Sequence, residues 1–206
     1  LAELPQYVDI QKYRELYQYI PELSTREREG KECIAPADCW TQIINHEIPQ
    51  LYPVFPYEQF GIGHDRLQLA IDTYWHGIET EGQRHYESWH QDNIFAARLG
   101  LTEEAKRLTV LKFQDSGRRF PAFWGPGCDW APDHNWGGSA MIGLQDMLVQ
   151  SAGNTVYLFP AWPKEWNVRF KLHLPQNTVV EAEIKNGKIN YEICSPYKMW
   201  KVVLPE

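Results

Sequence analysis

The spacing of apolar residues predicts four amphipathic helices in the middle of the chain. From Leu67 onward, apolar residues recur at i, i+3, i+4 and i+7, with charged and amide residues between them. This period predicts a helix over 64–79. The same reasoning predicts further helices over 88–99, 103–113 and 139–150. The connections between the first three are short, which favours antiparallel helical hairpins.

After Gly153 the period of the pattern changes to two. The segments 179–185 and 188–193 both alternate apolar and polar residues, and Asn186-Gly187 between them suits a tight turn that needs positive φ angles. This pair predicts a β-hairpin. Similar alternation predicts more strands at 155–159, 168–172 and 199–204, so the end of the chain is expected to form an antiparallel β unit.

The change of period divides the chain into two expected domains. Residues 1–153 form a helical part and residues 154–206 form a small antiparallel β domain. The fold class predicted from this pattern is mainly α with a C-terminal β unit. We expect four buried thiols from the cysteines, with a Cys33 to Cys39 disulfide as the alternative in an oxidising compartment.

Composition and charge exclude some classes of partner. The formal net charge is -7 with a pI near 5.5, and no run of Lys or Arg interrupts the acidic average, so the sequence predicts no nucleic-acid partner. No apolar stretch reaches the ~20 residues that cross a bilayer, so it predicts no membrane span. Aromatic residues make up 14% of the chain, enough either to build a core or to line a pocket for sugar rings.

The loop over 118–140 has the composition of a binding site. Prolines and glycines interrupt a run of aromatic and acidic residues, and a loop of this length in a folded domain usually binds something or packs as a lid. Aromatic neighbours would raise the pKa of the carboxyls. The alternative is that the rings only fill space and the carboxyls only cap turns. The candidate substrate-binding residues here are Phe123, Trp124, Asp129, Trp130, His134 and Asn135, with Asp133 as a catalytic candidate.

Several motifs appear in the same order as in a known enzyme family. The segment Asp133-His134-Asn135-Trp136-Gly137-Gly138 is followed by SAMIGLQDMLVQS and then by LFPAWPKEW at 158–166. Upstream are APADCW at 35–40 and NHEIPQLYPVFP at 45–56. Together these resemble the α-L-fucosidase-type glycoside hydrolases of family 95, and most closely their uncharacterised relatives from Bacteroidetes. The likeness runs from about residue 1 to 187 and is most specific between 118 and 166.

The resemblance implies a fold, a reaction and roles for residues. It implies the last helical hairpins of an (α/α)6 barrel followed by a β domain, and hydrolysis with inversion. Asp133 matches the aspartate on the base side of the reaction, whereas Asp38 falls near the general acid, with Glu47 as a rival for that role. Inversion needs two carboxyls with room for a water between them. The family's base-side asparagines belong to a first half of the barrel that this chain lacks, so the chain alone is expected to be incomplete.

Two more residues join the candidate site, and other chemistries are not expected. The segment around Trp89 and His90 resembles a family helix whose first residues face the cleft, although a lone histidine often only donates to a carbonyl. His46-Glu47 is no zinc motif, because Gln50 stands where the second histidine would be. Gly61-Ile62-Gly63 lacks the third glycine of a dinucleotide site. We therefore predict no metal and no cofactor.

These observations lead to one expected function and one alternative. We expect a glycoside hydrolase, exo-acting and fucosidase-like, or its C-terminal half, acting on an oligosaccharide or polysaccharide. The expected partner is the N-terminal half of the same protein, and the expected location is the periplasm or the extracellular space. The alternative is a non-catalytic carbohydrate-binding protein derived from such an enzyme. The identity of the sugar stays open.

Overall fold

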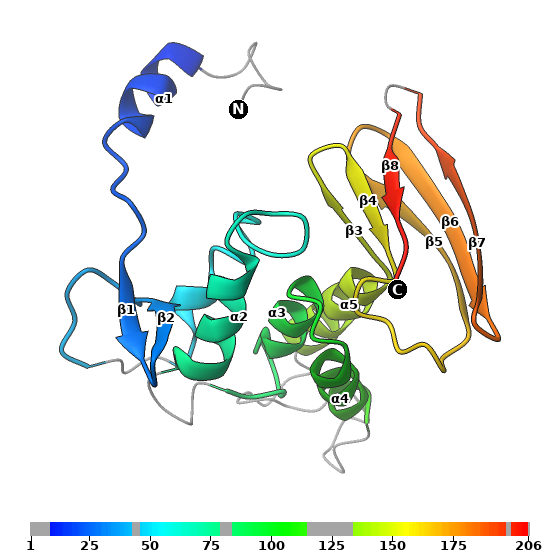
Figure 1. The fold of residues 1–206 in the computed structure, drawn as a ribbon, viewed down its shortest axis with the longest axis horizontal. Coiled ribbons are helices and arrows are strands. Elements are labelled where there is room, and N and C mark those ends of the chain that lie inside the picture. Colours follow the sequence, from blue (N-terminus) through cyan, green and yellow to red (C-terminus); the bar gives the residue numbers. More distant parts are fainter. Residues whose placement is uncertain (1–8, 43–45, 79–83, 115–133, 197–198, 206) are drawn as a thin grey trace.

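Helix α3 (Asp92–Arg98) is the centre of the helical part in the computed structural model of the protein (Figure 1). The structure describes residues 9–42, 46–78, 84–114, 134–196 and 199–205. All residues of α3 from Asp92 to Ala97 are buried, because α4 (Thr102–Phe113) and α5 (His134–Leu148) pack against it. A helix enclosed in this way has almost no side that faces solvent.

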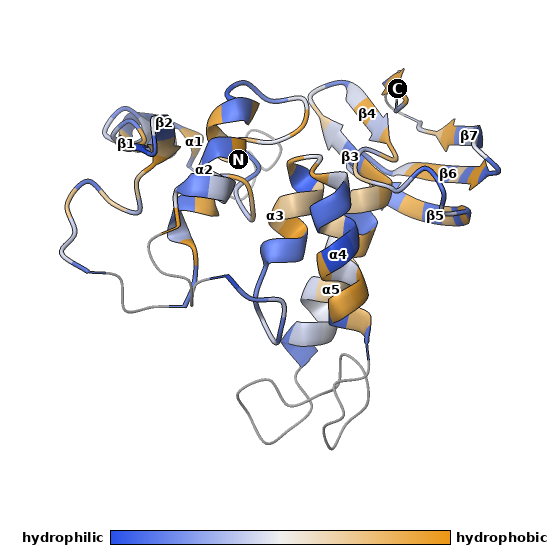
Figure 2. Cartoon of the chain, turned by 60° about the horizontal axis from the view of Figure 1, so that its bottom comes forward, coloured by the Kyte–Doolittle hydropathy of each residue, from blue (hydrophilic) through white to orange (hydrophobic). Residues whose placement is uncertain are grey.

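Helices α2 and α4 each keep one face toward solvent. Helix α2 (Leu67–His76) buries Leu69, Ala70 and Tyr74, and it packs against the 3-10 turn η1 (Pro49–Leu51) and strand β2 (Lys31–Ile34). Helix α4 begins with two glutamates in its first turn, where the helix dipole favours negative charge. Figure 2 shows both hydrophilic and hydrophobic residues on α4, and the buried ones are Ala105, Leu108, Thr109 and Lys112.

The strands form three small sheets. Strand β1 (Thr25–Arg28) pairs with β2 in an antiparallel hairpin. The second sheet has the order β3-β4-β8, and the third has the order β5-β6-β7. Their strands are β3 (Val149–Ala152), β4 (Thr155–Leu158), β5 (Val168–Leu174), β6 (Thr178–Lys185), β7 (Lys188–Cys194) and β8 (Lys201–Val203).

A single hydrophobic core joins the helices to the β strands. Alternate residues of β6 are buried, among them Val180, Ala182 and Ile184, and they belong to the same core as Phe95 and Met147. The β strands therefore pack on the helical part through their apolar face. Helix α1 (Ile10–Tyr17) has no buried residue and lies apart from α2–α5 (Figure 1).

The local predictions from the sequence are largely confirmed. Helices occur inside or across all four predicted segments, and the hairpin forms as β6 and β7, with Asn186 and Gly187 both at positive φ. Helix α5 ends at Leu148, and strand β3 takes up the residues that follow. The sequence pattern did not predict α1 or the β1–β2 hairpin.

The predicted fold class is wrong. Of the described residues, 33% are helical and 24% are in strands, so the chain is not mainly α, and no (α/α)6 barrel is evident among them. The physical reason lies in the segment before α2, where prolines and glycines produce turns, η1 and a β-hairpin instead of long helices. The limits of the two expected domains, 1–153 and 154–206, remain a prediction.

Two further expectations need correction. The C-terminal strands are not all antiparallel, because β8 pairs with β4 in the parallel sense, with Val156 opposite Val202. Of the cysteines that the structure describes, Cys33 is buried, whereas Cys39 and Cys194 are exposed, and none of the three is in a disulfide. Burial raises the pKa of the Cys33 thiol. Cys128 lies outside the described residues.

A pair of glycines in α5 tests the packing of this helix on α3. A Cβ at Gly143 would overlap the side-chain amide of Asn93 and lie 3.3 Å from the Asn93 carbonyl carbon, whereas a Cβ at Gly138 meets nothing within 4 Å. We expect Gly143→Ala to reduce the free energy of unfolding by about 1–3 kcal/mol. Gly138→Ala is the matched control and should raise it by about 0.5–1 kcal/mol. Urea unfolding measures both, and equal effects would show that α3 and α5 do not touch at Asn93.

Candidate functional site

A buried lysine holds the segment that carries two of the predicted site residues. Lys112 of α4 has no exposed surface. Its ammonium Nζ donates to the carbonyl oxygens of Tyr86 at 2.9 Å, Ser88 at 3.1 Å and His90 at 2.9 Å. Burial of a charge is unfavourable unless hydrogen bonds compensate, and three carbonyls supply them. The segment before α3 is therefore fixed by backbone contacts.

Trp89 and His90 in this segment form an aromatic surface. The ring of Trp89 stacks on that of His90, with centroids 5.5 Å apart and an angle of 16° between the planes. The ring of His85 lies next to that of His90, and their centroids are 5.2 Å apart. Burial lowers the pKa of His90 to about 4, and electrostatic interactions with His85, Lys112 and His46 lower it as well. His90 is therefore neutral at pH 7 and can both donate and accept a hydrogen bond.

A small cavity lies beside His90. Its volume is about 10 Å³, which is roughly the space that the centre of one water molecule occupies. Glu47 contributes to its wall and accepts a hydrogen bond from the hydroxyl of Tyr52. The cavity is lined by His46, Glu47, Ile48, Trp89, His90, Gln91, Asp92 and Phe95.

The aspartate in this wall has a strongly perturbed acidity. Asp92 is 3% exposed. Burial raises the pKa of its carboxyl to about 7, although the charges of Arg84 and Lys112 and a hydrogen bond from the backbone of His85 lower it in part. Its Oδ2 atom is buried and has no hydrogen-bond partner in the described structure. A buried carboxyl of this kind is a common mark of a functional site.

A second cavity is also bordered by Trp89. It has a volume of about 210 Å³, and its wall includes Asn135 from the start of α5 together with Ser139. The full lining is Phe55, Trp89, Gln91, Ile94, Asn135, Gly138, Ser139 and Ile142. Trp89 and Gln91 border both cavities. The two cavities are therefore adjacent to each other.

The structure brings four of the predicted site residues together around the Trp89 side chain. Glu47, His90 and Trp89 line the smaller cavity, and Asn135 and Trp89 line the larger one. Neither cavity is lined by His134 or by Asp38. His134 is exposed, and Asp38 is exposed and accepts a hydrogen bond from Ser24 Oγ at 3.2 Å. The remaining predicted residues lie outside the described ones: Phe123, Trp124, Asp129, Trp130 and Asp133.

Sequence reasoning missed Asp92 as a functional residue. A carboxylate in the first turn of a helix usually only complements the helix dipole, so its position gives no sign of a chemical role. The residues from Ile94 to Ala97 are all apolar, but Asn93 follows Asp92 directly and Arg98 ends the helix. The sequence pattern alone therefore gives little sign that Asp92 is buried.

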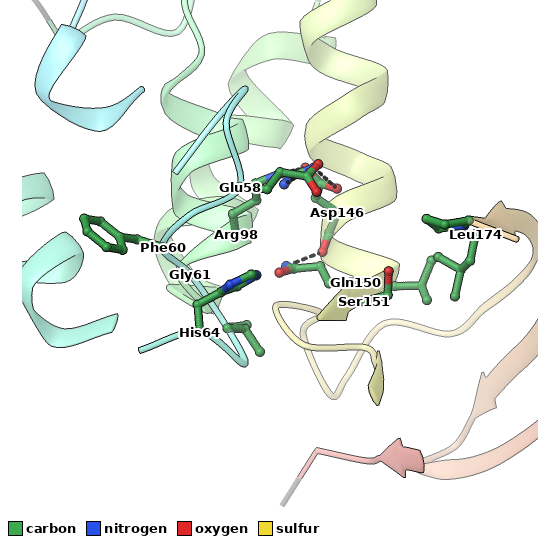
Figure 3. A pocket seen from close by; sticks show the side chains of 12 residues that line it. Glu58, Phe60, Gly61, His64, Arg98, Asp146, Gln150, Ser151 and Leu174 are labelled. Carbon is green, nitrogen blue, oxygen red and sulfur yellow. Dashed lines mark hydrogen bonds and ion pairs between the residues drawn. The ribbon is translucent and has the colours of Figure 1, made fainter. Parts of the chain in front are cut away.

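A third cavity, of about 170 Å³, lies at the opposite end of α3 (Figure 3). There Arg98 pairs with Asp146 of α5 at 2.8 Å and with Glu58 at 2.8 Å. Burial raises the pKa of Asp146 to about 6, although Arg98 lowers it in part. Because the two carboxylates already satisfy the guanidinium, we interpret this cluster as a structural tie between α3, α5 and the loop at Glu58.

Comparisons with known proteins give no independent identification. Neither the models of known protein families nor the curated proteins contain a match to this chain. Among the described residues, no three His, Cys, Asp or Glu side chains are grouped so that they could hold a metal ion. None of the described helices has the length and apolar character needed to cross a membrane. The function is therefore inferred from the residues of the site.

The role of Lys112 can be tested against another lysine of the same helix. Lys112→Met leaves carbonyls of the Tyr86 to His90 segment without their partner, so we expect a loss of about 2–4 kcal/mol in the free energy of unfolding. Lys106→Met is the control, because Lys106 forms a surface ion pair with Glu165 that should contribute little to the free energy of unfolding. Denaturant unfolding measures both. Equal losses would contradict the role given to Lys112.

The perturbed acidity of Asp92 predicts a pH dependence of stability. The folded-state pKa of about 7 lies above the ordinary aspartate pKa of 3.8, so the folded state holds the proton more tightly than the unfolded state. The contribution of Asp92 to the free energy of unfolding is fully present below about pH 4. It is lost as the pH rises to about 7, and it changes no further above that. Asp92→Asn removes this dependence. Its stability relative to the wild type should therefore rise by up to about 4 kcal/mol between pH 4 and pH 8. Thermal unfolding across this pH range is the measurement, and parallel curves would contradict it.

Proposed function

We propose that this protein acts on carbohydrate, as a glycoside hydrolase or as a part of one, with the glycan lying against Trp89. The observation that carries the proposal is the convergence on Trp89 of Glu47, His90 and Asn135, which come from three separate segments of the chain. Sugar rings have apolar C–H faces that pack on aromatic rings, and their hydroxyls need donors and acceptors around that ring. Trp89, the neutral imidazole and the side-chain amide provide both.

The carboxyl groups support hydrolysis over simple binding. Glu47 and Asp92 line the same one-water cavity, and hydrolysis of a glycoside with inversion uses two carboxyls with a water between them. The resemblance to family 95 hydrolases supports the same reaction from the sequence. The proposal uses this site and that resemblance, and it does not require an (α/α)6 barrel. Activity outside the cytoplasm, in the periplasm or extracellular space, and an N-terminal half as partner belong to the same proposal.

One observation favours the alternative of a non-catalytic carbohydrate-binding protein. Asp38, which the resemblance places near the general acid, is exposed and lines neither cavity next to Trp89. If no carboxyl can protonate the leaving oxygen, the aromatic surface would bind a glycan without cleaving it. The two functions differ in whether a product forms.

Binding and cleavage can be measured separately with one variant and one control. We expect Trp89→Ala to weaken binding of oligosaccharides by on the order of tenfold, because it removes the stacking surface. Trp75→Ala is the control, since Trp75 is 44% exposed on α2 and lines neither cavity. Calorimetry against fucosylated and non-fucosylated oligosaccharides gives the affinity, and proton NMR of the anomeric signals detects any product and its configuration.

The results of this experiment distinguish a hydrolase from a binding protein, and both from a protein that does not bind carbohydrate at Trp89. Release of a sugar with inverted configuration supports a hydrolase, and binding without release supports the binding protein. The proposal is wrong if the wild type binds none of the oligosaccharides, or if Trp89→Ala binds them as tightly as the wild type does.

A further inference from the structure

The cavity at the C-terminal end of α3 lies where the helices meet the β strands. Its wall combines side chains from the loop before α2, from α3 and α5, and from strands β3 and β5 (Figure 3). Small ligands bind preferentially in concave junctions of this kind. The cavity has a volume of about 170 Å³, and a cavity of about 150 Å³ is enough to hold a benzene ring. It therefore has room for one six-membered ring.

Hydrogen-bond acceptors predominate in this wall. Asp146 and Glu58 each pair with the Arg98 guanidinium at 2.8 Å, and their side chains stay 13% and 57% exposed. Because a carboxylate has about four lone-pair sites, the ion pairs fix both groups in place and leave them able to accept from a ligand. Gln150 donates through Nε2 to the carbonyl oxygens of Ala97 and Asp146, so its Oε1 is a further acceptor. A ligand that fits this wall has several donors.

Two more polar side chains of the wall are available to a ligand. The ring of His64 and the hydroxyl of Ser151 both line the cavity and are half-buried. Neither forms a hydrogen bond to another residue in the part of the chain that the structure describes. In Figure 3 the His64 ring points toward Gln150. A hydroxyl can donate and accept, and an imidazole has a nitrogen for either role, so both side chains suit a ligand with hydroxyl groups.

We propose that this cavity binds one pyranose ring of a neutral sugar, as a second carbohydrate site separate from the one at Trp89. A pyranose has the size of the cavity and carries several hydroxyl donors. Its apolar C–H groups can pack on Ile62, Val149 and Leu174, which line the same cavity. The inference goes beyond the proposed function, because it needs neither Trp89 nor cleavage. Helix α3 separates the two sites by about 9 Å along its axis, so each can be occupied without the other.

Charge and polarity argue against other small ligands. Arg98 brings one positive charge, and the two carboxylates that pair with it bring two negative ones. A protonated His64 would only balance these charges, so an anion finds no net attraction here. An apolar ring would take water from the carboxylates without replacing its hydrogen bonds. A ring with a positive charge is the main rival, and the experiment includes one.

The test starts from Trp89→Ala, so that the site at Trp89 does not contribute to binding. The probes are the methyl glycosides of glucose, galactose and mannose, and titration of the protein followed by NMR measures their affinity. We expect binding with a dissociation constant on the order of 1–10 mM, as is usual for a ligand of this size with a few hydrogen bonds. Adding His64→Leu or Ser151→Ala should weaken it by about three- to tenfold, because each removes a hydrogen bond to the sugar.

A matched control and two further probes keep the interpretation clear. His173→Leu is the control, because His173 is exposed on β5 and does not line the cavity. It should leave the dissociation constant within about twofold of its starting value. Cyclohexylamine is a ring of similar size with a positive charge, and glucuronate is a sugar with a negative charge. Both should bind more weakly than the best methyl glycoside. Circular dichroism checks that each variant is folded.

The results distinguish failure of this inference from failure of the proposed function. If Trp89→Ala binds no methyl glycoside, the second site is wrong, whereas oligosaccharide binding at Trp89 is unaffected by that result. Binding that neither His64→Leu nor Ser151→Ala weakens, or that His173→Leu weakens equally, also overturns the inference. Tighter binding of cyclohexylamine or glucuronate than of every methyl glycoside overturns the assignment to a neutral sugar. Weakening by His64→Leu and Ser151→Ala alone supports the second site even if no oligosaccharide binds at Trp89.

Discussion

The candidate site depends on one buried charge. The Lys112 ammonium binds three carbonyls of the segment before α3, and that segment carries Trp89 and His90 and leads directly into Asp92. The same charge lowers the pKa of both His90 and Asp92. A single interaction thus fixes the position of the aromatic surface and also adjusts the acidity of the groups beside it. Because the charge has no exposed surface, bulk salt screens it little.

Helix α3 connects the candidate site to the rest of the molecule. Its first residue, Asp92, lines the one-water cavity, and its last, Arg98, ties α5 and the loop at Glu58 together. Between these two ends, apolar residues pack into the core that includes Phe159 and Val180 of the β part. The polar groups of α3 therefore lie at its ends, where each has a distinct task, and its middle supplies only packing.

Local signals in the sequence predict the individual helices and the hairpin much better than they predict the tertiary arrangement. The Asn186-Gly187 hairpin and the amphipathic helices follow from φ preferences and from period, which act within a few residues. The parallel pairing of β8 with β4 joins residues more than forty positions apart and leaves no local trace. Trp89 and Glu47 could be suggested from motif order, whereas Asp92 could not, because its acidity comes from burial that only the packing of α3 creates.

The setting of Asp92 differs from that of an aspartate that only begins a helix. An aspartate that served only to begin α3 would keep its carboxylate in contact with solvent or paired with a donor. Asp92 does neither with its Oδ2, although Arg84 and Lys112 are near enough to shift its pKa. Such an arrangement lowers the stability of the folded protein at neutral pH, and Asn at this position would avoid the cost.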